Sequence, residues 1–380
     1  MRRREELIRK TKNIVIKIGS SVLVDSARAL NPKIFSRLAG EIADLLKSGR
    51  RMTIVSSGAV AGGIEKLSLR KYPAAIDEKQ AAAAIGQNYL MNLYEQAFAK
   101  YGIKIAQILL THDDFTNRER YVNAKNTLNK LFEMGVVPVV NENDTVATDE
   151  IRIGDNDNLS AQIVGLVNAD LLCILSDIEG LYDKDPKKFN DAKFVPLVDT
   201  ITERWLQAAG KAGNVVSVGG MRTKIEAALS ACSMGAAVII TDGRKQESIT
   251  KIFNGEPIGT LFLPKFGRLT ARKFWIAFTL RPSGAVVIDE GARKAIVEQQ
   301  KSLLPGGVRA VTGSFDRGGA VRILSEKGAE IGRGLTKYSS GEVAKLAGVK
   351  TTEINDKIGF KISDEVIHRD DMVILEERVR

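Results

Sequence analysis

The chain of 380 residues is long enough for two domains, since a domain usually takes roughly 100–200 residues. Its 56 lysines and arginines against 46 aspartates and glutamates give a formal net charge of +10, which permits anionic partners such as nucleotides or nucleic acid. The two cysteines, Cys173 and Cys232, lie in apolar segments, which excludes a disulfide framework. The N-terminus is charged and no run of about 18 apolar residues occurs, so we expect no signal peptide and no membrane partner. These features together predict a cytoplasmic protein.

The first residues carry the densest basic cluster of the chain, which begins with Arg2, Arg3 and Arg4. Such a cluster is more often a solvated arm than a binding arm, and we expect a solvated arm here.

Short apolar runs recur up to Ile240, and segments with helical periodicity separate them. The runs are continuous rather than alternating, as expected for strands that are buried on both faces of a sheet. Strands that alternate with helices predict an α/β fold with a parallel sheet and helices on both faces. The predicted strands are Ile14–Ile18, Met52–Val55, Ile105–Leu110, Val136–Val140, Leu171–Leu175 and Ala236–Ile240. The helical faces are Ile34, Leu38, Ile42 and Leu45; Leu159, Ile163, Leu166 and Val167; and Met221, Ile225, Ala228, Leu229 and Cys232.

The pattern changes after residue 250, where glycines and prolines mark a turn-rich connection. Beyond it the apolar runs are short and bounded by turns, which predicts a small, mainly β module. We therefore expect a first domain at 1–265, a linker at 266–282 and a second domain at 283–380. The predicted strands of the module are Ala285–Ile288, Val308–Val311, Ala320–Leu324 and Met372–Leu375.

Ligands of parallel sheets bind at the carboxyl ends of the strands, so the residues after each run are the first candidates. Lys17 interrupts the first run, and Gly19 and Ser20 follow it. An ammonium group there either points at a phosphate or reaches the surface at the strand end, and the local sequence does not choose between these. Ser57 and the following glycine open a predicted helix after the second run. This pattern is typical of an anion site and equally of a plain helix cap.

Polar residues gather after the fourth run, in NEND from Asn141 and in GDNDN from Gly154. So many acidic and amide side chains exceed what capping one helix needs, and carboxylates also suit Mg²⁺ with phosphate partners. The loop from Ser176 to Pro186 either holds a nucleotide base or is a surface turn.

The segment GGMRTK, from Gly219 to Lys224, opens a helix with two glycines, a hydroxyl and a lysine, which is a candidate phosphate cradle. Its spacing differs from that of the P-loop. Two lysines and several carboxylates after strands of one sheet favour phosphoryl transfer, which needs positioning and charge neutralisation. A metal hydrolase or a dehydrogenase is less well supported, because the chain has two histidines and no HExxH or GxGxxG motif.

The ordered set VIKIGSS, VSSGAVAGG, NENDTVATDEIRIGDNDNLSA, LSDIEGLYDKDP and GGMRTK resembles the glutamate 5-kinase family of the amino-acid kinase superfamily. The resemblance covers residues 12 to about 260. The tail resembles a PUA domain through VVIDEGARKAI, SLLPGGVRAVTG and HRDDMVIL, and this pairing is typical of the family.

The resemblance implies a three-layer α/β/α sandwich and ATP-dependent phosphorylation of the L-glutamate γ-carboxylate, the first step of proline biosynthesis. It implies Mg²⁺ bound with ATP rather than by fixed protein ligands. Proline is the implied feedback inhibitor, a glutamyl phosphate reductase is a possible partner, and a homo-oligomer is expected.

By the same resemblance, Lys17 and Lys224 would bind the ATP phosphates and Asp157 would orient both lysines. The implied glutamate-binding residues are Ser57, Asp144, Asp155 and Asn156. The implied nucleotide-binding residues are Lys17, Ser20, Ser176, Asp177, Val218, Gly219, Gly220, Met221, Arg222, Thr223 and Lys224. Val218 departs from the family, which commonly has threonine there, and Ser20 and Ser176 also replace threonine but keep a hydroxyl.

Two alternatives stay open. One is another member of the superfamily, acting on acetylglutamate, aspartate, carbamate or UMP. The other is an RNA-binding protein on a kinase-like scaffold. Residues 281–380 carry 17 lysines and arginines against 15 acidic residues, a small basic excess for a domain that grips RNA, so we favour a structural or regulatory role for the tail.

Overall fold

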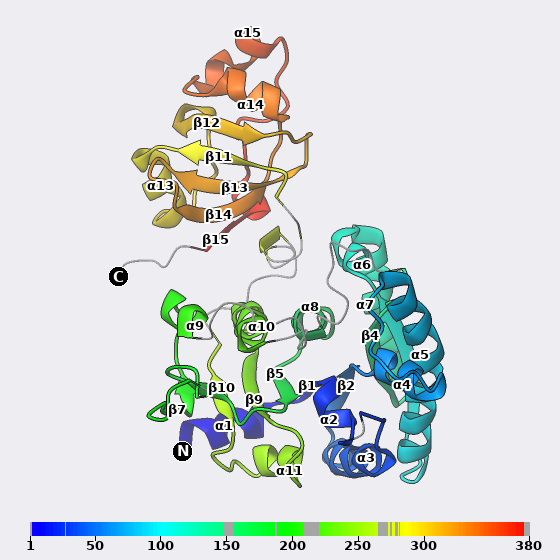
Figure 1. The fold of residues 1–380 in the computed structure, drawn as a ribbon. Helices are drawn as coiled ribbons and strands as arrows, with labels where there is room; N and C mark the ends of the chain where they lie inside the picture. Colours follow the sequence, from blue (N-terminus) through cyan, green and yellow to red (C-terminus); the bar gives the residue numbers. More distant parts are fainter. Residues whose placement is uncertain are drawn as a thin grey trace. The chain divides into compact units, whose positions relative to one another are not determined.

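The computed structural model describes residues 2–26, 28–146, 156–186, 188–208, 220–264, 273, 276–277, 280 and 282–375. The chain divides into two compact units, Met1–Arg268 and Leu269–Arg380 (Figure 1). The predicted linker at 266–282 falls largely outside the described residues.

The first unit is built around an eight-stranded sheet in the order β3-β4-β2-β1-β5-β9-β10-β8. β1 lies between β2 and β5, and all pairings from β3 to β9 are parallel. β10 pairs antiparallel with β9, a reversal that the sequence did not indicate. The strands are β1 (Asn13–Ile18), β2 (Arg51–Ser56), β3 (Lys104–Leu110), β4 (Val136–Glu142), β5 (Leu171–Ser176), β8 (Leu197–Val198), β9 (Ala237–Asp242) and β10 (Thr260–Phe262), with β6 (Leu181–Tyr182) and β7 (Phe194–Val195) as a separate hairpin.

Helices cover both faces of this sheet, as the periodicity predicted. Ile14, Ile16 and Ile18 of β1 join the hydrophobic core that includes α3, α5 and α11. Lys17 alternates with them, so it points to the opposite face, where α8 and α10 lie (Figure 1). The helices are α1 (Arg2–Lys10), α2 (Ser20–Leu23), α3 (Pro32–Lys47), α4 (Ala59–Lys66), α5 (Ile76–Ala99), α6 (His112–Thr116), α7 (Arg118–Glu133), α8 (Asn156–Val167), α9 (Glu203–Ala208), α10 (Met221–Ser233) and α11 (Ser248–Phe253).

The expectation of a solvated N-terminal arm is wrong. These residues form α1, in which Ile8 is buried against the core. Arg4 is also buried, and its guanidinium donates to the backbone carbonyls of Ile258 and Gly259. A helix with one apolar face can pack onto the core despite its basic composition. Burial of Ile8 is favourable, and most of the charged side chains keep their charged ends in solvent.

The second unit contains a five-stranded sheet in the order β12-β11-β13-β14-β15. It has its own apolar core, which includes Val286, Ile323 and Tyr338. The four strands expected in this module are present, and β14 is an additional one that its Gly332 and Gly334 hid from the sequence pattern. The elements are β11 (Gly284–Ile288), α13 (Glu290–Val297), β12 (Val308–Gly313), β13 (Ala320–Ser325), β14 (Glu330–Leu335), α14 (Ser340–Leu346), α15 (Ile354–Ile358) and β15 (Met372–Ile374), with short 3₁₀ turns at Pro305–Gly307, Thr351–Glu353 and Arg369–Asp371.

The topology of the first unit places the ends of distant segments together. β1, β2, β4, β5 and β9 are parallel, so their carboxyl ends lie along one edge of the sheet. Each of these strands is followed by a segment that carries a predicted site residue or lies next to one. No helix among the described residues is long and apolar enough to cross a membrane.

Candidate active site

Two buried lysines from different elements meet at one carboxylate. Lys17 Nζ of β1 lies 2.7 Å from Asp157 Oδ1, and Lys224 Nζ of α10 lies 3.1 Å from Asp157 Oδ2. Asp157 sits in the first turn of α8, and all three residues are at most 5% exposed. The structure thus brings together the three residues for which the sequence predicted a common role. Each carboxylate oxygen faces one ammonium group, which fixes the separation between the two cations.

The first turn of α10 adds a third donor to this cluster. Thr223 Oγ lies 2.8 Å from Asp157 Oδ2 and 2.9 Å from the carbonyl oxygen of Gly220, which caps the helix. The 13-residue helix therefore directs its amino-terminal end, with its partial positive charge, at the same place as the two lysines. Such an end attracts a phosphate group.

Opposing influences set the pKa of Asp157. Burial alone would raise the pKa of this carboxyl, but the ammonium groups of Lys17 and Lys224 and the hydroxyl of Thr223 hold the pKa well below its usual range. The carboxylate is therefore ionised at neutral pH, and it keeps both lysines in place.

Beside this cluster, a chain of side-chain amides joins three elements. Asn156 Nδ2 of α8 lies 3.0 Å from the Ser56 carbonyl oxygen, 2.9 Å from Ser57 Oγ and 2.9 Å from Asn141 Oδ1. Asn141, at the carboxyl end of β4, in turn donates from Nδ2 to Gln87 Oε1 of α5 at 2.8 Å. Because Asn156 and Asp157 are consecutive in the chain, this amide chain begins directly next to the lysine cluster.

Asn141 and Gln87 were not predicted as site residues. Asn141 belongs to the polar tract that the sequence singled out, so its type and place at a strand end gave a signal. Gln87 gave none, because a glutamine within a long helix has no distinguishing local pattern. Only the packing of α5 against the sheet brings it to the site.

Asp144 lies after β4 and is 9% exposed. Burial raises the pKa of its carboxyl to about 6. Burial and the Asp144 carboxylate both raise the pKa of Tyr72, so this tyrosine is a neighbour of Asp144. Among the described residues no cation pairs with Asp144, which leaves the carboxylate suited to a cationic group of a ligand.

The remaining predicted nucleotide-binding residues are distributed around this edge. Ser20 is exposed at the start of α2, and Ser176 is buried with its Oγ 3.1 Å from Asp177 Oδ1. The Asp177 carbonyl accepts a hydrogen bond from Arg244 Nη2 at 2.8 Å. In α10, Met221 is half-buried, and the Arg222 side chain pairs with Glu226 Oε1 at 2.9 Å, away from the lysine cluster. Asp155, Val218 and Gly219 lie outside the described residues.

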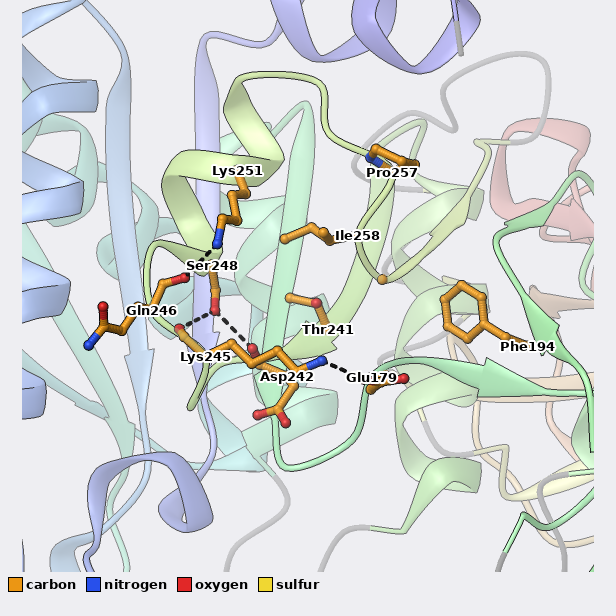
Figure 2. A pocket seen from close by; sticks show the side chains of 11 residues that line it. Glu179, Phe194, Thr241, Asp242, Lys245, Gln246, Ser248, Lys251, Pro257 and Ile258 are labelled. Atoms are coloured by element: carbon orange, nitrogen blue, oxygen red, sulfur yellow. Dashed lines mark hydrogen bonds and ion pairs between the residues drawn. The ribbon is translucent and has the colours of Figure 1, made fainter. Parts of the chain in front are cut away.

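A separate cavity of about 260 Å³ lies at the carboxyl end of β9, and Figure 2 shows its lining side chains. Thr241 alternates with Ile240 along the strand and shares the face of Ile239, which belongs to the core with α3 and α11. Ser248 and Lys251 of α11 line the cavity from the same face, and Asp242, the next residue of β9, lines it at the strand end. Lys245 at its rim pairs with Glu179, and Ser248 Oγ lies within 2.9 Å of the Asp242 and Lys245 carbonyls.

Comparisons with known proteins agree with this geometry. Residues 12–242 match the model of the amino acid kinase family, and residues 284–358 match that of the PUA domain. The glutamate 5-kinase of Geobacter metallireducens is 50% identical over 372 residues, which cover 98% of this chain and 100% of that protein. The chain belongs to the glutamate 5-kinases of the amino acid kinase family. The glutamate 5-kinase of Thermoanaerobacter sp. is 48% identical over 363 residues, 96% of this chain and 98% of that protein. The predicted family and both parts of the predicted fold are thereby confirmed.

Proposed function

We propose that this protein transfers the terminal phosphoryl group of ATP to the γ-carboxylate of L-glutamate and so makes γ-glutamyl phosphate, the first step of proline biosynthesis. The observation that carries the proposal is the pair of buried ammonium groups, Lys17 and Lys224, held about Asp157. Family membership across almost the whole chain supports the choice of glutamate as acceptor.

The chemistry that we assign to this cluster is positioning and charge stabilisation, without a covalent enzyme intermediate. Lys17 and Lys224 flank the phosphoryl group in transit and stabilise the charge on its oxygens. Asp157 keeps the two ammonium groups apart and aimed, and it is too strongly ionised to act as a general base. The reaction needs no general base, because the attacking γ-carboxylate is already deprotonated at neutral pH.

We propose that Mg²⁺ enters with ATP. Both oxygens of Asp157 face ammonium groups, and the described residues contain no cluster of three histidine, cysteine or acidic side chains able to hold a metal. Mg²⁺ is commonly held mainly by nucleotide phosphates and water, which fits this set of residues. When bound there, it neutralises phosphate charge.

For substrate recognition we propose that Ser57, Asn156 and Asp144 hold glutamate, with Asp155 nearby. The buried carboxylate of Asp144 suits the α-ammonium group. We assign the nucleotide to Ser20, Ser176, Asp177 and the segment from Val218 to Lys224.

The test is ADP release from Mg-ATP in the presence of glutamate, acetylglutamate or aspartate, with hydroxylamine to trap an acyl phosphate. We expect ADP release and a trapped hydroxamate with glutamate alone. Turnover with one of the other two acids would instead assign the protein to another branch of the superfamily, and no turnover with any of them would overturn the kinase proposal.

We also propose that proline inhibits the enzyme, that the chain forms a homo-oligomer and that a glutamyl phosphate reductase is a possible recipient of the product. We propose a cytoplasmic location, which the burial of both cysteines within the fold fits. We further propose that the first domain spans 1–265, the linker 266–282 and the second domain 283–380.

The PUA domain match supports RNA as a further possible partner of the second unit. Filter binding of RNA to the whole protein at two salt concentrations tests this, because binding through phosphate contacts weakens steeply as salt rises. If the filter-bound protein retained no RNA even at low salt, an RNA partner would be contradicted.

A further inference from the structure

Two polar atoms of the amide chain are buried without a hydrogen-bond partner among the residues that the structure describes. One is Gln87 Nε2, a donor, and the other is Asn156 Oδ1, an acceptor. Neither atom can use water freely, since both are shielded from solvent. Buried polar groups in native proteins are nearly always paired, so an unpaired donor and an unpaired acceptor in one network indicate a missing partner.

Backbone groups fix which atom of each amide is left over. The backbone N–H of Glu142 donates to Asn141 Oδ1 at 2.9 Å, so the other atom of that amide is a donor. This donor faces Gln87, whose contacting atom must therefore be its oxygen, which leaves the amino group of Gln87 unpaired.

The same reasoning applies to Asn156. Its amide faces the Ser56 carbonyl, which can only accept, so the contacting atom is nitrogen and the free atom is oxygen. Exchanging oxygen and nitrogen in any of these amides would place two donors or two acceptors against each other.

We propose that Gln87 is a specificity-determining residue that donates a hydrogen bond from Nε2 to the α-carboxylate of glutamate, while Asn156 Oδ1 accepts one from the α-ammonium group. This inference rests on the proposed function. A free α-amino acid carries an acceptor and a donor on the same carbon, and this pair complements the two unpaired atoms.

The order of residues along the network indicates which end of the substrate lies where. Asn156 adjoins Asp157 in the chain, and Gln87 is separated from it by Asn141. The carboxylate that reacts must lie at the lysine cluster, so the carboxylate that does not react lies toward the far end of the network. That end is Gln87.

Two substitutions separate binding from a structural role. Gln87→Ala removes both the contact to Asn141 and the free donor. Gln87→Glu keeps an oxygen for Asn141 Nδ2 but replaces the donor by a negatively charged acceptor, which repels a carboxylate. Asn88→Ala is the matched control, because Asn88 is exposed on the next position of the same helix.

We expect Gln87→Ala to raise the KM for glutamate by about 10- to 100-fold, as is usual for a lost hydrogen bond to a charged group, with the KM for ATP unchanged. Gln87→Glu should raise it at least as much, and Asn88→Ala should leave it unchanged. Competitive inhibition by 4-aminobutyrate, which is glutamate without its α-carboxylate, should be the same in the wild type and in Gln87→Ala.

A Gln87→Glu enzyme with the wild-type KM for glutamate would overturn the inference and leave Gln87 with a structural role only. Equal weakening of glutamate and 4-aminobutyrate in Gln87→Ala would do the same. Both results presuppose an active wild type, so they leave the proposed function standing. A wild type without glutamate-dependent turnover would overturn the proposed function and this inference together.

Discussion

Lys17 shows how burial decides the role of a charged residue. A lysine near a strand end is compatible with a side chain that reaches the solvent, and its local sequence does not distinguish this from a phosphate contact. In the structure it is 5% exposed and its ammonium group contacts Asp157. A buried ammonium group is costly unless it is paired with an opposite charge. The ion pair with Asp157, and not the strand, therefore accounts for a lysine at this buried position.

Removing one lysine of the cluster should cost activity rather than stability. Lys224→Met leaves Lys17 paired with Asp157, so the remaining charges balance each other. We expect turnover to fall by about 100-fold or more, the usual cost of losing a group that stabilises transition-state charge, with a nearly unchanged free energy of unfolding. Steady-state kinetics and urea unfolding measure the two effects.

Asp157→Asn should behave differently, because it leaves two buried ammonium groups facing each other. We expect it to lower turnover and also to lower the free energy of unfolding by about 3–5 kcal/mol. If Asp157→Asn were as stable as Lys224→Met, the lysines would have another source of compensation and the role of Asp157 would have to be revised.

Asp144 should make glutamate binding depend on pH. Its pKa is raised to about 6, so below that value it is neutral and no longer attracts an ammonium group. We expect the KM for glutamate to rise as the pH falls from 8 to 5, and this rise should disappear in Asp144→Asn, whose KM is high throughout. A parallel pH dependence in both enzymes would remove Asp144 from glutamate binding.

The same pKa has a consequence for stability. A carboxyl whose pKa is higher in the folded than in the unfolded state destabilises the fold above its folded pKa, and this cost fades as the pH falls through it. Asp144→Asn should therefore stabilise the ligand-free protein by up to about 3 kcal/mol at pH 8 and by less at pH 5.

At the scale of elements, two helices hold the substrate side of the site by direct backbone packing. A Cβ atom on Gly86 of α5 would lie 1.8 Å from the Ala59 carbonyl oxygen of α4, and one on Gly63 of α4 would lie 1.9 Å from the Ala82 carbonyl oxygen. α4 begins two residues after Ser57, and Gly86 precedes Gln87. The close contact therefore sets the positions of Ser57 and Gln87 relative to each other.

Gly86→Ala should force α4 and α5 apart. We expect a loss of roughly 1–3 kcal/mol in the free energy of unfolding, as for overpacked cores, together with a higher KM for glutamate. Gly341→Ala is a suitable control, since that helical glycine has open space where a Cβ would be added and should be neutral or slightly stabilising. A neutral Gly86→Ala would show that the two helices separate easily.

Elements with a strong local pattern were predictable, and those without one were not. The six predicted strands of the first unit appear as β1 to β5 and β9. Short continuous apolar runs are typical of strands that are buried on both faces of a parallel sheet. β10 is too short for its pattern to be read, and its antiparallel direction depends on the turn that precedes it. β14 alternates glycine with other residues, which lowers its apparent strand character.

At the scale of the molecule, the chain contains two units with separate apolar cores. The predicted catalytic and substrate-binding residues that the structure describes, from Lys17 to Lys224, all lie in the first unit. Each core excludes water by itself, so each unit has the means to fold independently.

A fragment ending at Arg268 should therefore fold and keep glutamate-dependent turnover close to that of the whole chain. Thermal unfolding of the whole chain should not fit a single two-state transition, because the two units have separate cores. Circular dichroism of the fragment serves as the control for folding. A folded but inactive fragment would show that the second unit contributes to catalysis.

The sequence by itself determined the α/β class, the strand and helix positions with strong periodicity, and the family, because these follow from local composition and from motifs in a fixed order. It also pointed to Lys17, as a lysine in a buried strand, and to Lys224, as a lysine at a helix start, and the family resemblance added Asp157. Only the tertiary structure decided that one carboxylate serves both lysines and that Gln87, Asn141 and Asn156 form one chain. Parallel topology brings the ends of strands distant in sequence to one edge, and no local pattern encodes the distances that result.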